Sequence, residues 1–390
     1  MGKFRKVIDN NRIFVLNQQV AWTTVQPGDA GVFLPRHPPT HRIAAVPRSH
    51  DGTSHHSTLT AMLRETRSLW SAALLLAVLT SHGCAPVDRP DILALATAGT
   101  GGVYYVLGGS IAELWSRELP AHDFVAEVTG GSVENLSLLL GGDVQVAFSM
   151  GTSAHEVFYA IGSFSEREPA QVLALTALYP NVLHLVTVEG TGVESLSDLV
   201  GRRISVGAPG SGTEVAARTL LEGNGIGYDD FQPQRLNFNE TASALRDGNI
   251  DAGFVSAGPP TSAIVDLATA RPVRLIPIAM AEVENTAVLD PTVIRDFFLP
   301  GTYPGQEVEV ETLSTPNLLV VRADMSEELV YNLIQTLSAV QAELAGVHPA
   351  ASYISPEYTL SVSPIPLHPG AVRFFVEAGY EVPDRLILSP

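Results

Sequence analysis

Lysine is absent after position 6, and the 390-residue chain has a single cysteine, Cys84. Without lysine the body of the chain cannot supply a P-loop, which ends in Gly-Lys-Ser/Thr, and it cannot form a Schiff base. One cysteine excludes an intrachain disulfide. These absences exclude P-loop nucleotide binding, lysine-based covalent catalysis and disulfide stapling.

Other signatures of chemistry are also missing. A dinucleotide-binding fingerprint needs glycine where Tyr104 stands, and a nucleophile elbow around Ser211 needs glycines where Pro209 and Thr213 stand. The histidines of the body stand singly, so we expect no metal site and no cofactor. No nucleophile with a matching base can be identified, and we therefore expect that the protein is not an enzyme.

Charge is distributed unevenly along the chain. Residues 1–83 contain nine basic and four acidic residues, whereas residues 84–390 contain 14 basic and 37 acidic residues. An acidic body repels nucleic acid and anionic membrane surfaces, so we expect neither of them as a direct partner.

The N-terminal part has the layout of an export signal. An uncharged apolar run at residues 69–79 follows Arg64 and Arg67 and precedes small residues. This pattern predicts a signal over residues 62–84, too short in its apolar part to span a bilayer comfortably. Residues 1–61 are then either an over-extended gene start or a disordered extension, and both alternatives stay open.

Cys84 is a candidate lipidation site, because it follows Gly83 at the end of this signal. The two residues before Gly83 are Ser81 and His82, unlike the usual Leu-Ala, so plain cleavage nearby remains an alternative. Either way we expect a periplasmic or cell-surface protein that contacts the membrane only through a lipid anchor or a permease.

The body contains two similar halves. A strand, a glycine turn and a helix surround residues 99–102, and the same elements surround residues 210–213. Each half continues with a helix, a glycine stop and a strand, at residues 132–151 and 239–258. Strand-turn-helix followed by helix-turn-strand, twice, predicts an α/β protein with two lobes and mainly parallel sheets.

The glycine turns are candidate anion sites. A helix N-terminus offers unpaired N–H groups and a partial positive charge, which can hold a carboxylate or phosphate without a basic side chain. The alternative is that Ser211 and Thr213 simply cap their helix.

Seven runs over roughly residues 90–380 resemble the TAXI family of solute-binding proteins, the extracytoplasmic receptors of TRAP transporters. The resemblance implies a two-lobed, type II-like periplasmic-binding-protein fold that closes on a small carboxylate or amino-acid-like solute in a cleft between the lobes. It also implies delivery of the solute to TRAP membrane permease subunits. A ligand sensor for a signalling partner, or less plausibly a periplasmic enzyme, is the alternative. The runs are GTGGVYYVLGG, TGGSVENL, LYPNVLHLV, VGAPGSGTEV, DGNIDAGFVSAGPPT, PGTYPGQ and PIPLHPGAVRFF.

The resemblance also implies an organisation and a set of binding residues. We expect lobe 1 to comprise residues 88–183 and 318–390, and lobe 2 to comprise residues 184–317. Tyr104 and Tyr179 could instead be packing aromatics, and Asn135 could pair with its own helix start. The candidate ligand-binding residues are Thr100, Gly101, Tyr104, Ser132, Asn135, Met150, Tyr179, Ser211, Gly212, Thr213, Ser256 and Ala257.

The sequence departs from the family pattern at one strand end. Relatives usually show Phe-Val-Gln-x-Asp, but here Met150 and Thr152 replace the Gln and the Asp. We expect this strand end to face the cleft, so that the change removes an amide and a carboxylate from it. An ammonium group would then lack its acidic partner, which favours a less polar or purely anionic solute.

Overall fold

The computed structural model describes residues 90–388, which form ten strands and eleven α-helices. The predicted export signal, Cys84 and residues 1–61 lie outside this range. The strands are β1 (Asp91–Ala96), β2 (His122–Glu127), β3 (Val146–Met150), β4 (Val172–Val188), β5 (Arg203–Ser205), β6 (Gln232–Gln234), β7 (Ala252–Ala257), β8 (Val273–Leu275), β9 (Ile294–Phe298) and β10 (Val310–Arg322). The helices are α2 (Val103–Glu118), α3 (Ser132–Gly141), α4 (Gly151–Tyr159), α5 (Gly212–Gly223), α6 (Phe238–Arg246), α7 (Ser262–Ala270), α8 (Met280–Leu289), α9 (Glu327–Ala339), α10 (Gln341–Val347), α11 (Pro356–Val362) and α12 (Pro369–Glu377).

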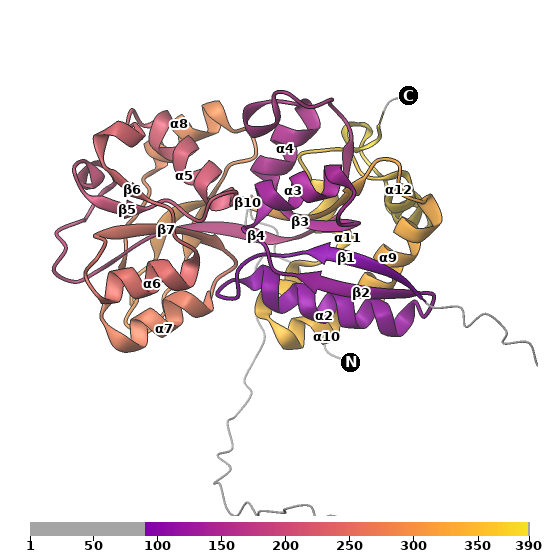
Figure 1. Cartoon of the computed structure of the whole chain (residues 1–390), viewed down its shortest axis with the longest axis horizontal. Helices are drawn as coiled ribbons and strands as arrows, with labels where there is room; N and C mark the ends of the chain where they lie inside the picture. Colours follow the sequence, from indigo (N-terminus) through magenta and orange to yellow (C-terminus); the bar gives the residue numbers. More distant parts are fainter. Residues whose placement is uncertain (1–89, 389–390) are drawn as a thin grey trace, which may run out of the picture. The chain divides into compact units, whose positions relative to one another are not determined.

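All ten strands belong to one mixed sheet with helices on both faces (Figure 1). The strand order is β2-β1-β3-β10-β4-β7-β5-β6, with β8 beside β4 and β9 beside β10. Pairing is parallel within β2-β1-β3 and within β7-β5-β6, and antiparallel wherever β4 or β10 takes part. The long strands β4 and β10 therefore join two parallel α/β units, as expected for a two-lobed α/β fold.

The buried apolar side chains divide in the same way. One core cluster holds residues between 94 and 179 and between 318 and 386, and we call this part lobe 1. Two further clusters hold residues between 182 and 313, which we call lobe 2, and one of them also includes Met150 from the end of β3. Val182 and Leu183 belong to the lobe 2 clusters, so the cores separate near Pro180, slightly before the boundary that the sequence predicts. The exact lobe boundaries remain our proposal.

The internal correspondence seen in the sequence has a structural basis. Gly142 and Gly248 follow α3 and α6, and both adopt left-handed backbone angles, with φ of 83° and 74°. Glycine tolerates this conformation without strain, which explains why it ends both helices. Phe148 in β3 and Phe254 in β7 are both fully buried at matching positions. The predicted repeat of strand-turn-helix and helix-turn-strand is confirmed.

Residues 90–388 contain neither a membrane-spanning helix nor a cluster of metal ligands. None of the helices there is long and apolar enough to cross a membrane. Nor does any group of three or more His, Cys, Asp or Glu side chains in that range gather as metal ligands would.

Candidate functional site

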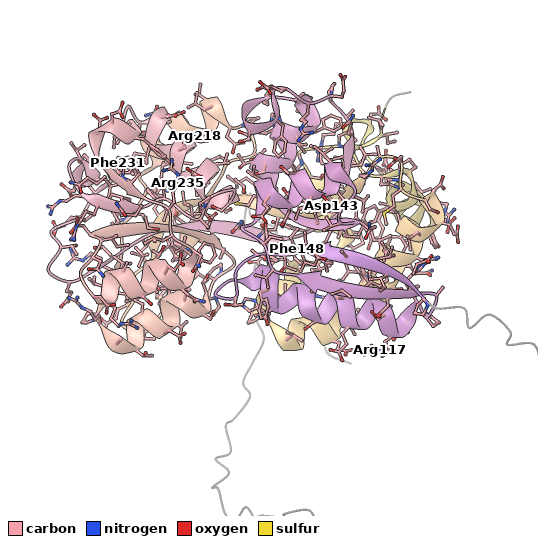
Figure 2. The ribbon with its side chains drawn as sticks, viewed as in Figure 1. Arg117, Asp143, Phe148, Arg218, Phe231 and Arg235 are labelled. Carbon is pink, nitrogen blue, oxygen red and sulfur yellow. The ribbon has the colours of Figure 1, made fainter. Side chains whose placement is uncertain are left out.

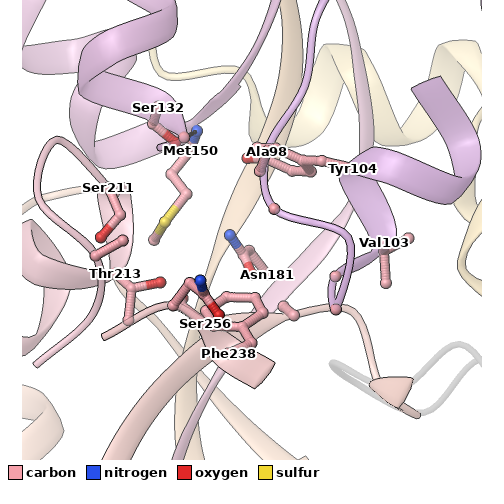
Figure 3. Close-up of a pocket in the computed structure, with 18 of the residues that line it drawn as sticks. Ala98, Val103, Tyr104, Ser132, Met150, Asn181, Ser211, Thr213, Phe238 and Ser256 are labelled. Atoms are coloured by element: carbon pink, nitrogen blue, oxygen red, sulfur yellow. Dashed lines mark hydrogen bonds between the residues drawn. The ribbon is translucent and has the colours of Figure 1, made fainter. Parts of the chain in front are cut away.

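A pocket lies between the two lobes, where the carboxyl ends of β1 and β3 face those of β5 and β7 (Figure 3). Its volume is about 60 Å³. Its lining residues are Ala98, Gly99, Gly101, Gly102, Val103, Tyr104, Gly130, Gly131, Ser132, Met150, Tyr179, Asn181, Ala208, Ser211, Gly212, Thr213, Asn237, Phe238, Ser256 and Ala257.

Two helices begin at this pocket with N–H groups available for a solute. Helix α2 begins after Gly102, which provides no side-chain cap. Helix α5 begins after Ser211, whose Oγ accepts a hydrogen bond only from the Glu214 N–H, at 3.2 Å. The first N–H groups of each helix can therefore hold an anionic group, aided by the partial positive charge of the helix end.

The start of α3 serves a different purpose. The carbonyl oxygen of Gly210 in lobe 2 accepts hydrogen bonds from the N–H groups of Val133 and Glu134 in lobe 1, at 3.1 and 3.0 Å. These donors join the lobes and are not free for a solute. Helix α6 is capped in the same way as α5, because Asn237 Oδ1 accepts a hydrogen bond from the Glu240 N–H at 3.0 Å.

The lobes also touch at the rim of the pocket. Asn239 Nδ2 donates to Thr100 Oγ1 at 3.2 Å, and Ser262 Oγ donates to the carbonyl oxygen of Gly101 at 3.1 Å. The structure therefore shows the lobes in direct contact around the pocket.

Met150 crosses between the lobes. It ends strand β3 of lobe 1, yet its side chain packs with the apolar core of lobe 2. A Cβ atom added to Gly212 would lie 2.6 Å from Met150 Sδ and 2.7 Å from Ser132 Oγ. Figure 3 shows Met150 extending from beside Ser132 toward Thr213. A side chain at position 212 would therefore have to displace Met150 and Ser132, which pack against the start of α5.

Most of the predicted binding residues meet at this pocket. Thr100 and Asn135 are the two that the structure does not bring to it. Whether the others contact a solute remains a prediction. Those that line the pocket are Gly101, Tyr104, Ser132, Met150, Tyr179, Ser211, Gly212, Thr213, Ser256 and Ala257.

Asn135 supports the pocket from behind instead of lining it. Its side chain is fully buried, and Nδ2 donates to the carbonyl oxygens of Thr97 and Phe148, at 2.6 and 2.8 Å. Its Oδ1 accepts from the hydroxyl of Thr129 at 2.5 Å. The amide thus ties the ends of β1 and β3 together and positions the loop before α3, a role different from pairing with its own helix start.

We expect Asn135→Ala to lower the free energy of unfolding by about 2–3 kcal/mol, because buried polar groups at two strand ends lose their partner. Urea denaturation of the full-length chain measures this. Asn285→Ala, at an exposed position of α8, is the matched control and should stay within about 0.5 kcal/mol. A similarly small effect at Asn135 would contradict the bracing role.

Thr152 does not face the pocket, contrary to the prediction. Strand β3 ends at Met150 and helix α4 begins at Gly151, so the alternation of a strand no longer applies at position 152. The Thr152 hydroxyl is buried and donates to Asp290 Oδ2 at 2.7 Å. Thr152 therefore does not determine the charge of the pocket. Whether acidic side chains are present there depends on the residues that line it.

The two lining tyrosines are neutral hydrogen-bonding groups. Burial raises the pKa of Tyr104 and of Tyr179 above the ordinary range. The Tyr104 hydroxyl donates to Asn317 Oδ1, and its ring packs on Phe148 with centroids 4.8 Å apart. Tyr104 is therefore largely a packing aromatic with a satisfied hydroxyl, whereas Tyr179 has no such partner.

Three buried polar atoms of the lining lack a hydrogen-bond partner among the described residues. They are Tyr179 Oη, Asn181 Oδ1 and Ser256 Oγ. The exposed fractions of these residues are 1%, 2% and 6%. Buried polar groups in native proteins are nearly always paired, so these atoms are left to pair with water or with a bound molecule.

No residue of the lining set carries a charge. Arginines of the described chain form ion pairs elsewhere: Arg117 with Glu343 at 3.2 Å, and Arg235 with Glu214 at 2.9 Å. Figure 2 shows Arg117 at the lower edge of the molecule and Arg235 within lobe 2. Backbone N–H groups and neutral side chains are thus the means by which the pocket can recognise a solute.

Three polar or aromatic lining residues were not predicted from the sequence, namely Asn181, Asn237 and Phe238. Asn181 stands two positions after Tyr179 in a strand, and this period would have placed both on one face. Asn237 and Phe238 begin the helix after β6, a helix start without the glycine turn that drew attention to the others.

Comparison with known proteins places the chain in a family. A family model described as NMT1-like matches residues 95–379. The periplasmic aliphatic sulphonate binding protein SsuA from Escherichia coli has 15% sequence identity over 77% of this chain and 93% of its own, with a TM-score of 0.41. PhnD1 from Prochlorococcus marinus, in complex with methylphosphonate, has 11% identity over 68% and 91%, with a TM-score of 0.46. These two likenesses are too low to say what this chain binds. The family match spans most of the chain, which therefore belongs to the NMT1-like family.

Proposed function

We propose that the protein is an extracytoplasmic solute-binding receptor that captures a small anionic solute between its lobes. The observation that carries this is the pocket itself: helix starts from both lobes meet there, and buried polar atoms of its lining lack partners. A receptor needs only differential affinity of the solute for the closed state, and no chemical step.

The binding mode follows from the helix starts. A carboxylate placed between the N-termini of α2 and α5 would accept hydrogen bonds from backbone N–H groups on both lobes. The solute then links the lobes and adds its contacts to the direct ones made by Gly210, Thr100 and Gly101. Closure is favoured by the sum of these contacts.

The proposal also includes the type of transporter to which the receptor delivers its solute. The seven runs that resemble the TAXI family support a receptor that delivers its solute to the membrane subunits of a TRAP transporter. Membership of the NMT1-like family does not by itself select this subfamily. Export, and anchoring through Cys84, are proposed from the sequence of residues 62–84.

A thermal-shift screen of the full-length chain tests the receptor function. Carboxylates, oxoacids, amino acids, sulfonates and phosphonates form the panel. A ligand of the native state at 100 times its Kd adds about 2.7 kcal/mol, which raises the Tm by about 3–4 °C for a protein of this size. No shift with any solute of the panel, confirmed by calorimetry, would contradict the proposal.

A further inference from the structure

From the groups that the pocket presents, we infer that the solute is a small monocarboxylate that also carries a hydroxyl group and has no ammonium group. The inference rests on the proposed function, because it names the solute class of the same pocket.

The lining supports one negative charge and not two. Each helix N-terminus carries a partial charge of roughly +0.5, so the starts of α2 and α5 together balance the charge of a single carboxylate. A second carboxylate would be buried where no lining residue is charged. The excess of acidic residues over the body of the chain adds repulsion. Dicarboxylates are therefore disfavoured.

An ammonium group has no acidic partner at the pocket. The lining contains no Asp or Glu. The carbonyl oxygens of Gly101 and Gly210 at the rim already accept hydrogen bonds from the opposite lobe. Burying an ammonium group there would cost its hydration without a compensating ion pair, which disfavours amino acids.

The three unpaired atoms lie on one side of neighbouring strands. Tyr179 and Asn181 lie two residues apart in β4, and both line the pocket. Ser256 in β7 pairs in register with Leu183, which lies on the same face of β4 as Asn181. These side chains form the polar floor of the pocket, which we define as Tyr179, Asn181 and Ser256.

A hydroxyl group fits the polar floor better than the alternatives. It can donate to Asn181 Oδ1 while it accepts from the hydroxyl of Ser256 or Tyr179. A carbonyl group can only accept, which would leave Asn181 Oδ1 unpaired. A methyl group pairs with none of the three atoms.

The pocket also limits the size of the solute. The pocket's volume of about 60 Å³ favours a molecule with few non-hydrogen atoms. A three-carbon hydroxy acid, with six such atoms, is the natural probe.

Calorimetric titration of the full-length chain with four matched three-carbon acids tests the inference. The probes are 2-hydroxypropanoate, propanoate, alanine and 2-hydroxymalonate. We expect 2-hydroxypropanoate to bind most tightly, propanoate at least about 10-fold more weakly, and alanine and 2-hydroxymalonate at least about 100-fold more weakly.

Two variants test whether the polar floor recognises the hydroxyl group and excludes the ammonium group. Ser256→Ala should reduce the preference for 2-hydroxypropanoate over propanoate to less than about threefold, whereas Ser137→Ala, at an exposed site on α3, should leave it unchanged. Asn181→Asp places an acid of equal size in the floor and should tighten alanine binding at least about 10-fold. The Tm of each variant reports whether it is folded.

The outcomes separate this inference from the proposed function. Alanine or 2-hydroxymalonate binding as tightly as 2-hydroxypropanoate would overturn the hydroxy-monocarboxylate class, and the receptor function would stand. The same holds if none of the four binds while another solute of the wider panel does. Only the absence of binding across that panel rejects both.

Discussion

Gly212→Val is expected to weaken solute binding on the order of 1,000-fold while the protein remains folded. The added side chain would enter the space that Met150 Sδ and Ser132 Oγ occupy, 2.6 and 2.7 Å from an added Cβ. The lobes could then no longer approach each other, and the solute would lose the contacts of one lobe. A 1,000-fold loss corresponds to about 4 kcal/mol.

Folding should survive this substitution because position 212 does not need glycine for its backbone angles. The Tm of the variant should therefore stay close to that of the parent. Gly109→Val is the matched control, since a Cβ at that position in α2 meets nothing within 4 Å, and its solute affinity should not change. Binding of the Gly212→Val variant within tenfold of the parent would contradict the closed pocket described here.

The second large effect is expected at Trp115, which we predict to cost about 3–5 kcal/mol of unfolding free energy when changed to Ala. Trp115 is fully buried in α2, and its Nε1 donates to the carbonyl oxygen of Leu333 in α9 at 3.0 Å. This side chain joins the first segment of lobe 1 to the segment that returns after lobe 2. The loss would combine a cavity with the loss of this hydrogen bond.

Urea denaturation measures the effect, with Tyr105→Ala on the exposed side of the same helix as control. Tyr105 is 44% exposed, and its truncation should change the free energy of unfolding by no more than about 0.5 kcal/mol. A loss below about 1 kcal/mol at Trp115 would indicate that the two segments do not share one core.

The two-lobed fold could be predicted because its signals are local. Glycines end helices at Gly142 and Gly248, and buried strands follow both, so a repeated order of elements is visible in the chain itself. The pairing of β10 between β3 and β4 involves segments more than 130 residues apart, which the pattern alone does not reveal. The family resemblance supplied that part of the expectation.

The site was predictable where it depends on the backbone and less so where it depends on side-chain direction. The glycine turns do meet, because parallel strands end at the same edge of a sheet. Thr152 was placed wrongly because the strand ends two residues earlier. Asn135 lies at the predicted helix start but points toward strand ends whose proximity only the fold creates. Thr100 is exposed at the rim, while its glycine neighbours line the pocket.

The central claim is that one small solute is held by backbone groups of both lobes at once. A crystal structure of the full-length chain with the solute that the screen identifies tests this most directly. We predict that its carboxylate oxygens lie within hydrogen-bonding distance of N–H groups at the starts of both α2 and α5. A solute bound to only one lobe, or held by arginine side chains outside this pocket, would contradict the account.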